Sequence, residues 1–60
     1  MLKETLNRFE AEIIRTCIRR HHGVLPAAAK DLAISTSWLY ARIHKYGLEG
    51  DMEKARAAAR

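Results

Sequence analysis

The side chains best suited to bind another molecule lie together between residues 35 and 45. They combine hydroxyl, indole and basic groups: Ser35, Thr36, Ser37, Trp38, Ala41, Arg42 and Lys45. Side chains near the start of a recognition helix reach the base edges of DNA, and later basic residues meet phosphates. In a helix, Arg42 and Lys45 would follow Trp38 at steps of four and three, on one side. These residues therefore indicate a helix that enters the major groove, and the alternative is an ordinary solvated helix face.

A long helix is expected ahead of this segment. Its apolar residues recur at steps of three and four: Leu2, Leu6, Phe9, Ile13 and Cys17. Ile14 and Ile18 widen this stripe. This spacing predicts an α-helix with a broad apolar face that ends near Gly23. The face is wider than two short helices can cover. We therefore expect part of it to form a dimer interface, made by Leu2, Leu6, Phe9, Ile13 and Cys17.

Two shorter helices are expected next. Pro26 suits the first turn of a helix that ends near residue 33. Ser35 is the predicted N-cap of the following helix, because its hydroxyl can accept a hydrogen bond from a free backbone N–H. Leu39 and Ile43 mark the buried side of that helix, and Gly47 ends it.

Composition narrows the class of protein. The net charge of +4 and a pI near 9.7 favour a polyanionic partner. Cys17 is the only cysteine, which excludes an internal disulfide and fits a reducing, cytoplasmic location. No apolar run approaches the roughly 20 residues of a membrane span, so we expect no membrane partner.

Neither an active site nor a cofactor site is expected. The sequence has no paired carboxylates, no nucleophile beside a base and no glycine-rich phosphate loop. Cys17 and His21 are spaced four apart, as metal ligands on a helix are, and His22 or His44 could join them. Apolar packing for Cys17 and a helix-dipole role for the histidines are the commoner roles, so the sequence assigns no metal.

Several short motifs occur in an order that is typical of one family. They are Phe9-Glu10, Ile14, Gly23, Ala28-Ala29, Leu32-Ala33-Ile34-Ser35, Leu39-Tyr40 and Tyr46-Gly47-Leu48. With them, residues 2–48 resemble the Fis-type helix-turn-helix of the nucleoid protein Fis and of NtrC-like sigma-54-dependent activators. The resemblance implies a two-fold dimer with a recognition helix, about residues 36–46, in each of two major grooves. It also implies base contacts for Thr36, Trp38 and Ala41, and phosphate contacts for the basic residues.

Three departures from the family pattern affect these expectations. Ala33 stands where glycine is usual, which costs on the order of 1 kcal/mol if the residue has a positive φ. Val24-Leu25-Pro26 replaces a polar segment that often contacts phosphate, so the resemblance does not transfer those contacts. Trp38 occupies the place of a small residue, so the base preference of the family does not transfer either.

The sequence therefore predicts an all-α, homodimeric, sequence-specific DNA-binding domain at residues 1–50. Residues 51–60 are expected to be a polar tail that forms at most a short, frayed helix. The parent protein is either a free-standing, nucleoid-associated protein or an activator with an AAA+ ATPase domain ahead of this segment. The rival function is a helical dimerisation module that binds protein instead of DNA, and the salt dependence of DNA binding separates the two.

Overall fold

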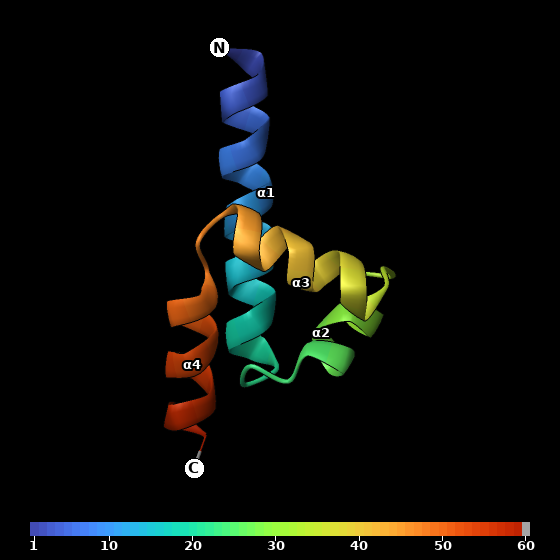
Figure 1. Cartoon of the computed structure of the whole chain (residues 1–60), viewed down its shortest axis with the longest axis vertical. Coiled ribbons are helices and arrows are strands. Elements are labelled where there is room, and N and C mark those ends of the chain that lie inside the picture. The colour runs from blue at the N-terminus through green and yellow to red at the C-terminus, as the bar shows by residue number, and fades with distance from the viewer. Residues whose placement is uncertain (60) are drawn as a thin grey trace.

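The computed structural model describes residues 1–59, and every regular element in that range is a helix (Figure 1). Helix α1 spans Leu2–Arg20, α2 spans Leu25–Asp31, α3 spans Thr36–Lys45 and α4 spans Glu49–Ala58. The predicted all-α class and long first helix are confirmed. None of the helices within residues 1–59 has the length and apolar character needed to cross a membrane.

One cluster of buried side chains joins the four helices. Its members are Ile14, Cys17, Ile18, Leu25, Ala28, Ala29, Leu39, Ile43, Leu48 and Met52. All three α1 members come from the second half of that helix. In Figure 1, α3 crosses α1 near its middle, α2 lies to the right and α4 runs beside the C-terminal half of α1. The N-terminal half of α1 therefore extends beyond the core.

The turn between α2 and α3 requires a left-handed residue. Ala33 has a φ of +57°, and its N–H donates to the Lys30 carbonyl at 3.1 Å. The N–H of Ile34 donates to the Ala29 carbonyl at 3.0 Å. These two bonds form a Schellman motif, whose left-handed position favours glycine. The expectation that residue 33 has a positive φ, at which alanine is strained, is thus confirmed.

The other two turns also contain residues in the left-handed conformation. After α1, His22 and Gly23 have φ values of +55° and +76°, and the Gly23 N–H donates to the Ile18 carbonyl at 2.9 Å. After α3, Gly47 has a φ of +64° and the buried residue Leu48 folds back onto the core. The predicted end of α3 is confirmed, whereas the first left-handed residue after α1 is His22 instead of Gly23.

The C-terminal segment differs from the expectation of a polar tail. Residues 51–59 belong to α4 and its cap, and α4 packs along α1 with Met52 buried and Ala55 partly buried. The Arg56 side chain donates from Nε to the Gly23 carbonyl at 3.0 Å. A single methionine and a few alanines give too weak a periodic signal to reveal this packing from sequence. Arg60 lies outside the described residues.

Candidate nucleic-acid interface

Helix α3 is held in one orientation by its inner face and its N-cap. Leu39 and Ile43 are completely buried in the core. The Ser35 hydroxyl oxygen accepts a hydrogen bond from the Trp38 N–H at 3.0 Å, which confirms the predicted cap. Because the inner face is fixed, the opposite face of α3 is presented to solvent at a defined angle.

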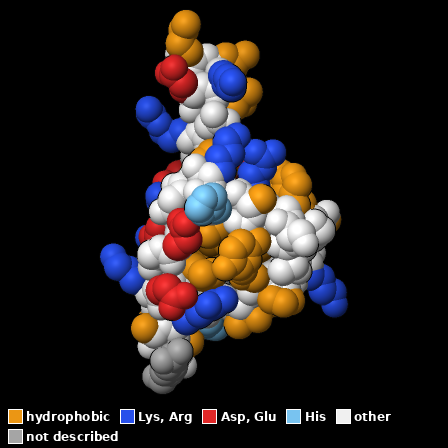
Figure 2. All heavy atoms as spheres, in the orientation of Figure 1, with side chains coloured by type: hydrophobic (Ala, Val, Ile, Leu, Met, Phe, Trp, Pro, Cys, Tyr) orange, Lys and Arg blue, Asp and Glu red, His pale blue; other side chains and the backbone are white. Residues whose placement is uncertain are grey.

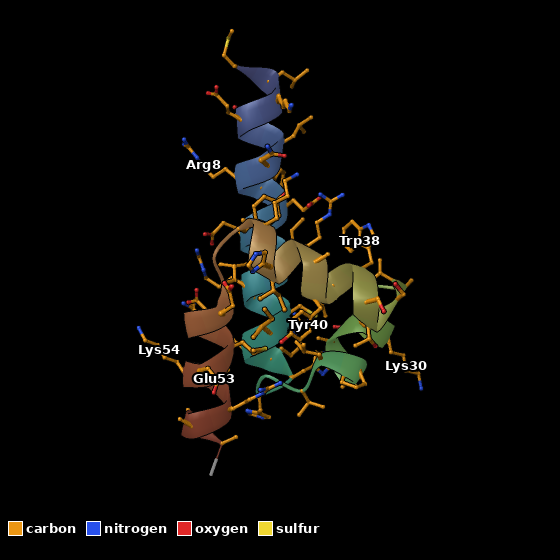
Figure 3. The ribbon with its side chains drawn as sticks, in the orientation of Figure 1. Arg8, Lys30, Trp38, Tyr40, Glu53 and Lys54 are labelled. Atoms are coloured by element: carbon orange, nitrogen blue, oxygen red, sulfur yellow. The ribbon has the colours of Figure 1, made fainter. Side chains whose placement is uncertain are left out.

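Most of the predicted contact residues are exposed to solvent. The exposed ones are Ser35, Thr36, Ser37, Trp38, Ala41 and Lys45. Trp38 is 39% exposed, and Figure 3 shows its ring at the edge of α3, away from the core. The structure therefore excludes the buried role that is common for tryptophan. The side chain is available to contact another molecule.

Arg42, the seventh predicted contact residue, is half-buried between α3 and α1. Its guanidinium carbon lies 4.4 Å from the centre of the Trp38 ring, a cation–π contact. Its Nε lies 3.5 Å from Oε1 of Glu10, and the Tyr46 hydroxyl donates to the same oxygen at 2.6 Å. This hydrogen bond to Glu10 raises the pKa of Tyr46. Glu10 thus ties α1 to the C-terminal half of α3, a role that no local spacing in the sequence indicates.

An exposed apolar row runs along α1 from its protruding N-terminal end to its middle. Leu2, Leu6, Phe9 and Ile13 are 76%, 55%, 66% and 49% exposed. Hydrophobic side chains gather on one side of this protruding end in Figure 2. Cys17, the fifth residue predicted for the dimer interface, is instead buried within its own chain. Single exposed apolar residues are ordinary on a protein surface, whereas a row of four on one helix is less common.

Comparison with known protein families shows the family of this chain. The model for bacterial regulatory proteins of the Fis family covers residues 3–46. The chain belongs to this family. Membership implies a non-enzymatic helix-turn-helix domain that binds DNA, in keeping with the absence of catalytic motifs. Searches of curated proteins and of solved structures found no match.

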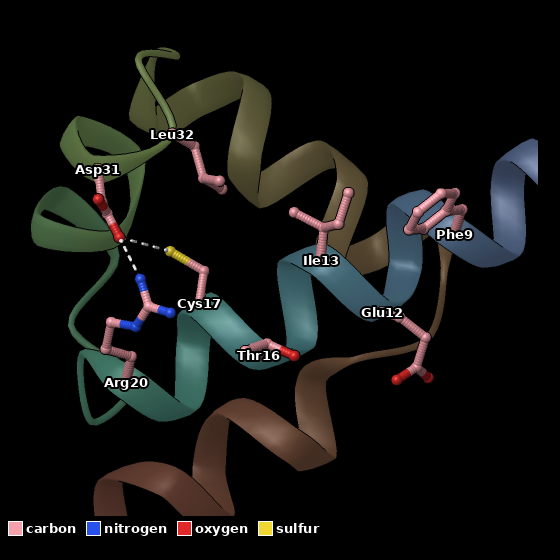
Figure 4. A pocket seen from close by; sticks show the side chains of 8 residues that line it. All are labelled: Phe9, Glu12, Ile13, Thr16, Cys17, Arg20, Asp31 and Leu32. Atoms are coloured by element: carbon pink, nitrogen blue, oxygen red, sulfur yellow. Dashed lines mark hydrogen bonds and ion pairs between the residues drawn. The ribbon is translucent and has the colours of Figure 1, made fainter.

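A hollow of about 330 Å³ separates α1 from the end of α2 in this Fis-family domain (Figure 4). Its lining residues are Phe9, Glu12, Ile13, Thr16, Cys17, Arg20, Asp31 and Leu32. The end near Phe9, Ile13 and Leu32 is apolar and continues the exposed row. The end near Cys17, Arg20 and Asp31 is polar, so the two ends suit different ligands.

Asp31 is the centre of the polar end. Its Oδ2 atom lies 3.0 Å from Nε2 of His21, 3.6 Å from Sγ of Cys17 and 3.4 Å from Nη1 of Arg20. The hydrogen bond from His21 is the main reason that the pKa of Asp31 lies below its usual value. Burial, helped by Asp31, raises the pKa of the Cys17 thiol. The sequence pointed to Cys17 and His21, but it did not reveal that Asp31 meets them.

Proposed function

We propose that this domain binds double-stranded DNA in a sequence-specific manner as a homodimer, and so regulates transcription in a bacterium. The observation that carries the proposal is the fixed position of α3 together with the side chains that it exposes. The helix is capped by Ser35 and fixed through Leu39 and Ile43, and it presents hydroxyl, indole and ammonium groups on one free face. A rigid helix with such a face can be inserted into the major groove without further ordering of its backbone.

The side chains of α3 divide into two groups by chemistry. Thr36, Trp38 and Ala41 are proposed to face base edges, where an indole or a methyl group can contact the methyl group of thymine. Ser35, Ser37, Arg42 and Lys45 are proposed to lie nearer the phosphates. Arg42 pairs with Glu10 through Nε. Its terminal N–H groups remain as donors, so it can bind a phosphate while Glu10 holds it in place.

The apolar row on α1 supports the dimer. Leu2, Leu6, Phe9 and Ile13 lie along one side of α1, and each is at least 49% exposed. Burying such side chains is favourable by about 25 cal/mol for each Å² of apolar surface. A second copy with the same row is the partner that two-fold symmetry suggests. The two recognition helices would then reach major grooves about one helical turn apart.

The cellular context follows from the two kinds of protein that the sequence resembles. The domain suits a free-standing, cytoplasmic, nucleoid-associated regulator, and it equally suits the effector domain of a sigma-54-dependent activator. An AAA+ ATPase domain in the parent reading frame would identify the second case. In both contexts the DNA-binding unit has the same chemistry, so one assay tests it.

The proposal is tested by titrating a labelled duplex of mixed sequence with the protein at several salt concentrations, followed by fluorescence anisotropy. The logarithm of the binding constant should fall linearly with the logarithm of the salt concentration. Lys45→Ala should flatten that slope by about 0.9 units for each protomer bound, as the loss of one phosphate contact does. Lys54→Ala is the matched control, because Lys54 projects from α4 on the side away from α3 in Figure 3. A slope near zero would favour the protein-binding module instead.

A further inference from the structure

Three side chains that can bind a metal meet at the polar end of the hollow or beside it. We propose that Cys17, His21 and Asp31 bind a zinc ion between α1 and α2. Their ligand atoms lie within 4.8 Å of one another. Thiolate, imidazole and carboxylate groups are the three kinds of side chain that bind zinc in proteins. The site does not depend on the DNA-binding function, since none of its residues lies on α3.

Two of the distances between the donor atoms can be compared with those around a tetrahedral zinc ion. With a Zn–S bond of about 2.3 Å and Zn–N and Zn–O bonds of about 2.1 Å, sulfur and oxygen are about 3.6 Å apart, and nitrogen and oxygen about 3.4 Å apart. In the structure, Sγ of Cys17 lies 3.6 Å from Oδ2 of Asp31, and Nε2 of His21 lies 3.0 Å from the same oxygen. The sulfur–oxygen distance already fits, and the nitrogen would have to move about 0.4 Å away from the oxygen. Sγ and Nε2 lie within 4.8 Å of each other, against about 3.6 Å around zinc, so the side chains would close around the ion.

The backbone positions the ligands independently of any metal. Cys17 lies in the last part of α1 and His21 caps the same helix four residues later, so both face one side. Asp31 is the last residue of α2, and α2 packs on α1 through Ala28 and Ala29. The core therefore holds the three donors near one another before the ion binds, so binding does not have to order this part of the backbone.

The charges of the site also suit a divalent cation. The Cys17 thiol would release its proton to solvent, and the resulting thiolate and the Asp31 carboxylate would balance the two charges of zinc. Arg20 is the competing cation, with Nη1 3.4 Å from Asp31. Its side chain is 66% exposed, so it can turn into solvent. Cys17 and Asp31 line the hollow, which leaves room there for water as the fourth ligand.

Zinc at this position would stabilise the helix-turn-helix directly. It would join the end of α1 to the end of α2, beside the left-handed turn at Ala33 that leads into α3. An ion that binds only the folded state raises the ratio of folded to unfolded protein by a factor of 1 + [Zn²⁺]/Kd. At a free zinc concentration of about 100 times Kd, that ratio should increase about 100-fold.

Cobalt is the spectroscopic probe for this site. Titration of the reduced protein with Co²⁺ should produce a thiolate-to-cobalt charge-transfer band and visible d–d bands of tetrahedral intensity, saturating at one ion per chain and disappearing when Zn²⁺ is added. His21→Gln and Asp31→Asn should weaken binding at least tenfold, and both leave the buried core intact. His44→Gln is the matched control, because the His44 side chain is 82% exposed on α3. It should bind cobalt as the parent protein does.

Thermal melts give the second readout. Zinc should raise the melting temperature of the parent protein and of His44→Gln, but not that of His21→Gln or Asp31→Asn, and Mg²⁺ should raise none of them. Absence of the charge-transfer band would overturn the proposal. So would one ion per two chains with loss of binding in His44→Gln, since that pattern means zinc joins exposed histidines of different molecules. Neither readout involves DNA, so failure of DNA binding would leave the result intact.

Discussion

The strain at Ala33 leads to a prediction of unusual sign, because Ala33→Gly should stabilise the protein. Ala33 has a φ of +57° within the hydrogen-bonded turn after α2. A residue with a Cβ atom loses about 1–2 kcal/mol in this conformation. Glycine avoids that loss but gains conformational freedom in the unfolded chain, which costs about 0.4–1 kcal/mol. The strain that glycine removes is larger than the stability lost through the freer unfolded chain. The free energy of unfolding should therefore rise by about 0.5–1 kcal/mol.

Thermal melts at equal protein concentration measure this difference. For a domain of this size, 1 kcal/mol corresponds to a change of about 4–8 °C in Tm, so Ala33→Gly should raise Tm by several degrees. Ala41→Gly is the matched control, because Ala41 is an exposed alanine with neighbours on both sides in α3. There glycine should lower the stability by about 1 kcal/mol. A decrease in Tm for Ala33→Gly as large as that for Ala41→Gly would refute the left-handed turn.

Three further outcomes are expected. Phe9→Glu should leave the helix content unchanged but abolish the dimer, so that sedimentation equilibrium at tens of micromolar gives about 6.9 kDa instead of twice that mass. Arg42→Ala should weaken binding to all DNA sequences alike, whereas Trp38→Ala should cost about 1–3 kcal/mol on the preferred site and less elsewhere, by anisotropy titration. The lowered pKa of Asp31 means that its stabilising effect is present above its ordinary value of 3.8 and is lost as the pH falls through the folded-state value. Asp31→Asn should therefore reduce the loss of Tm on acidification.

Local features of the fold were predictable because each depends on a few neighbouring residues. The period of the apolar residues in α1 and the Ser35 cap have a signal within one or two helical turns. The left-handed position at Ala33 followed from the family resemblance, because alanine itself does not indicate a positive φ. The solvent face of α3 followed from the same periodicity, since Leu39 and Ile43 fix its opposite side.

Contacts between helices were missed because their partners are distant in the sequence. Asp31 meets Cys17 and His21 only after α2 has folded back onto α1. Met52 is the one large apolar residue of α4, and a single residue has no period. Cys17 belonged to the apolar stripe of α1 and was assigned to the dimer interface with the rest. Its burial depends on the position of α2, which the stripe alone does not determine.

Glu10 connects the two surfaces on which the proposed function depends. It follows Phe9 of the apolar row, and its carboxylate receives Tyr46 and Arg42 from the C-terminal half of α3. Buried contacts through Leu39 and Ile43 fix the inner face of α3 against the core. The hydrogen bond from Tyr46 and the ion pair with Arg42 add polar contacts at its C-terminal end, and the Ser35 cap closes its N-terminal end. In a dimer formed through α1, this carboxylate would therefore join the recognition helix to α1 one residue away from the proposed subunit interface, in addition to the contacts through the core.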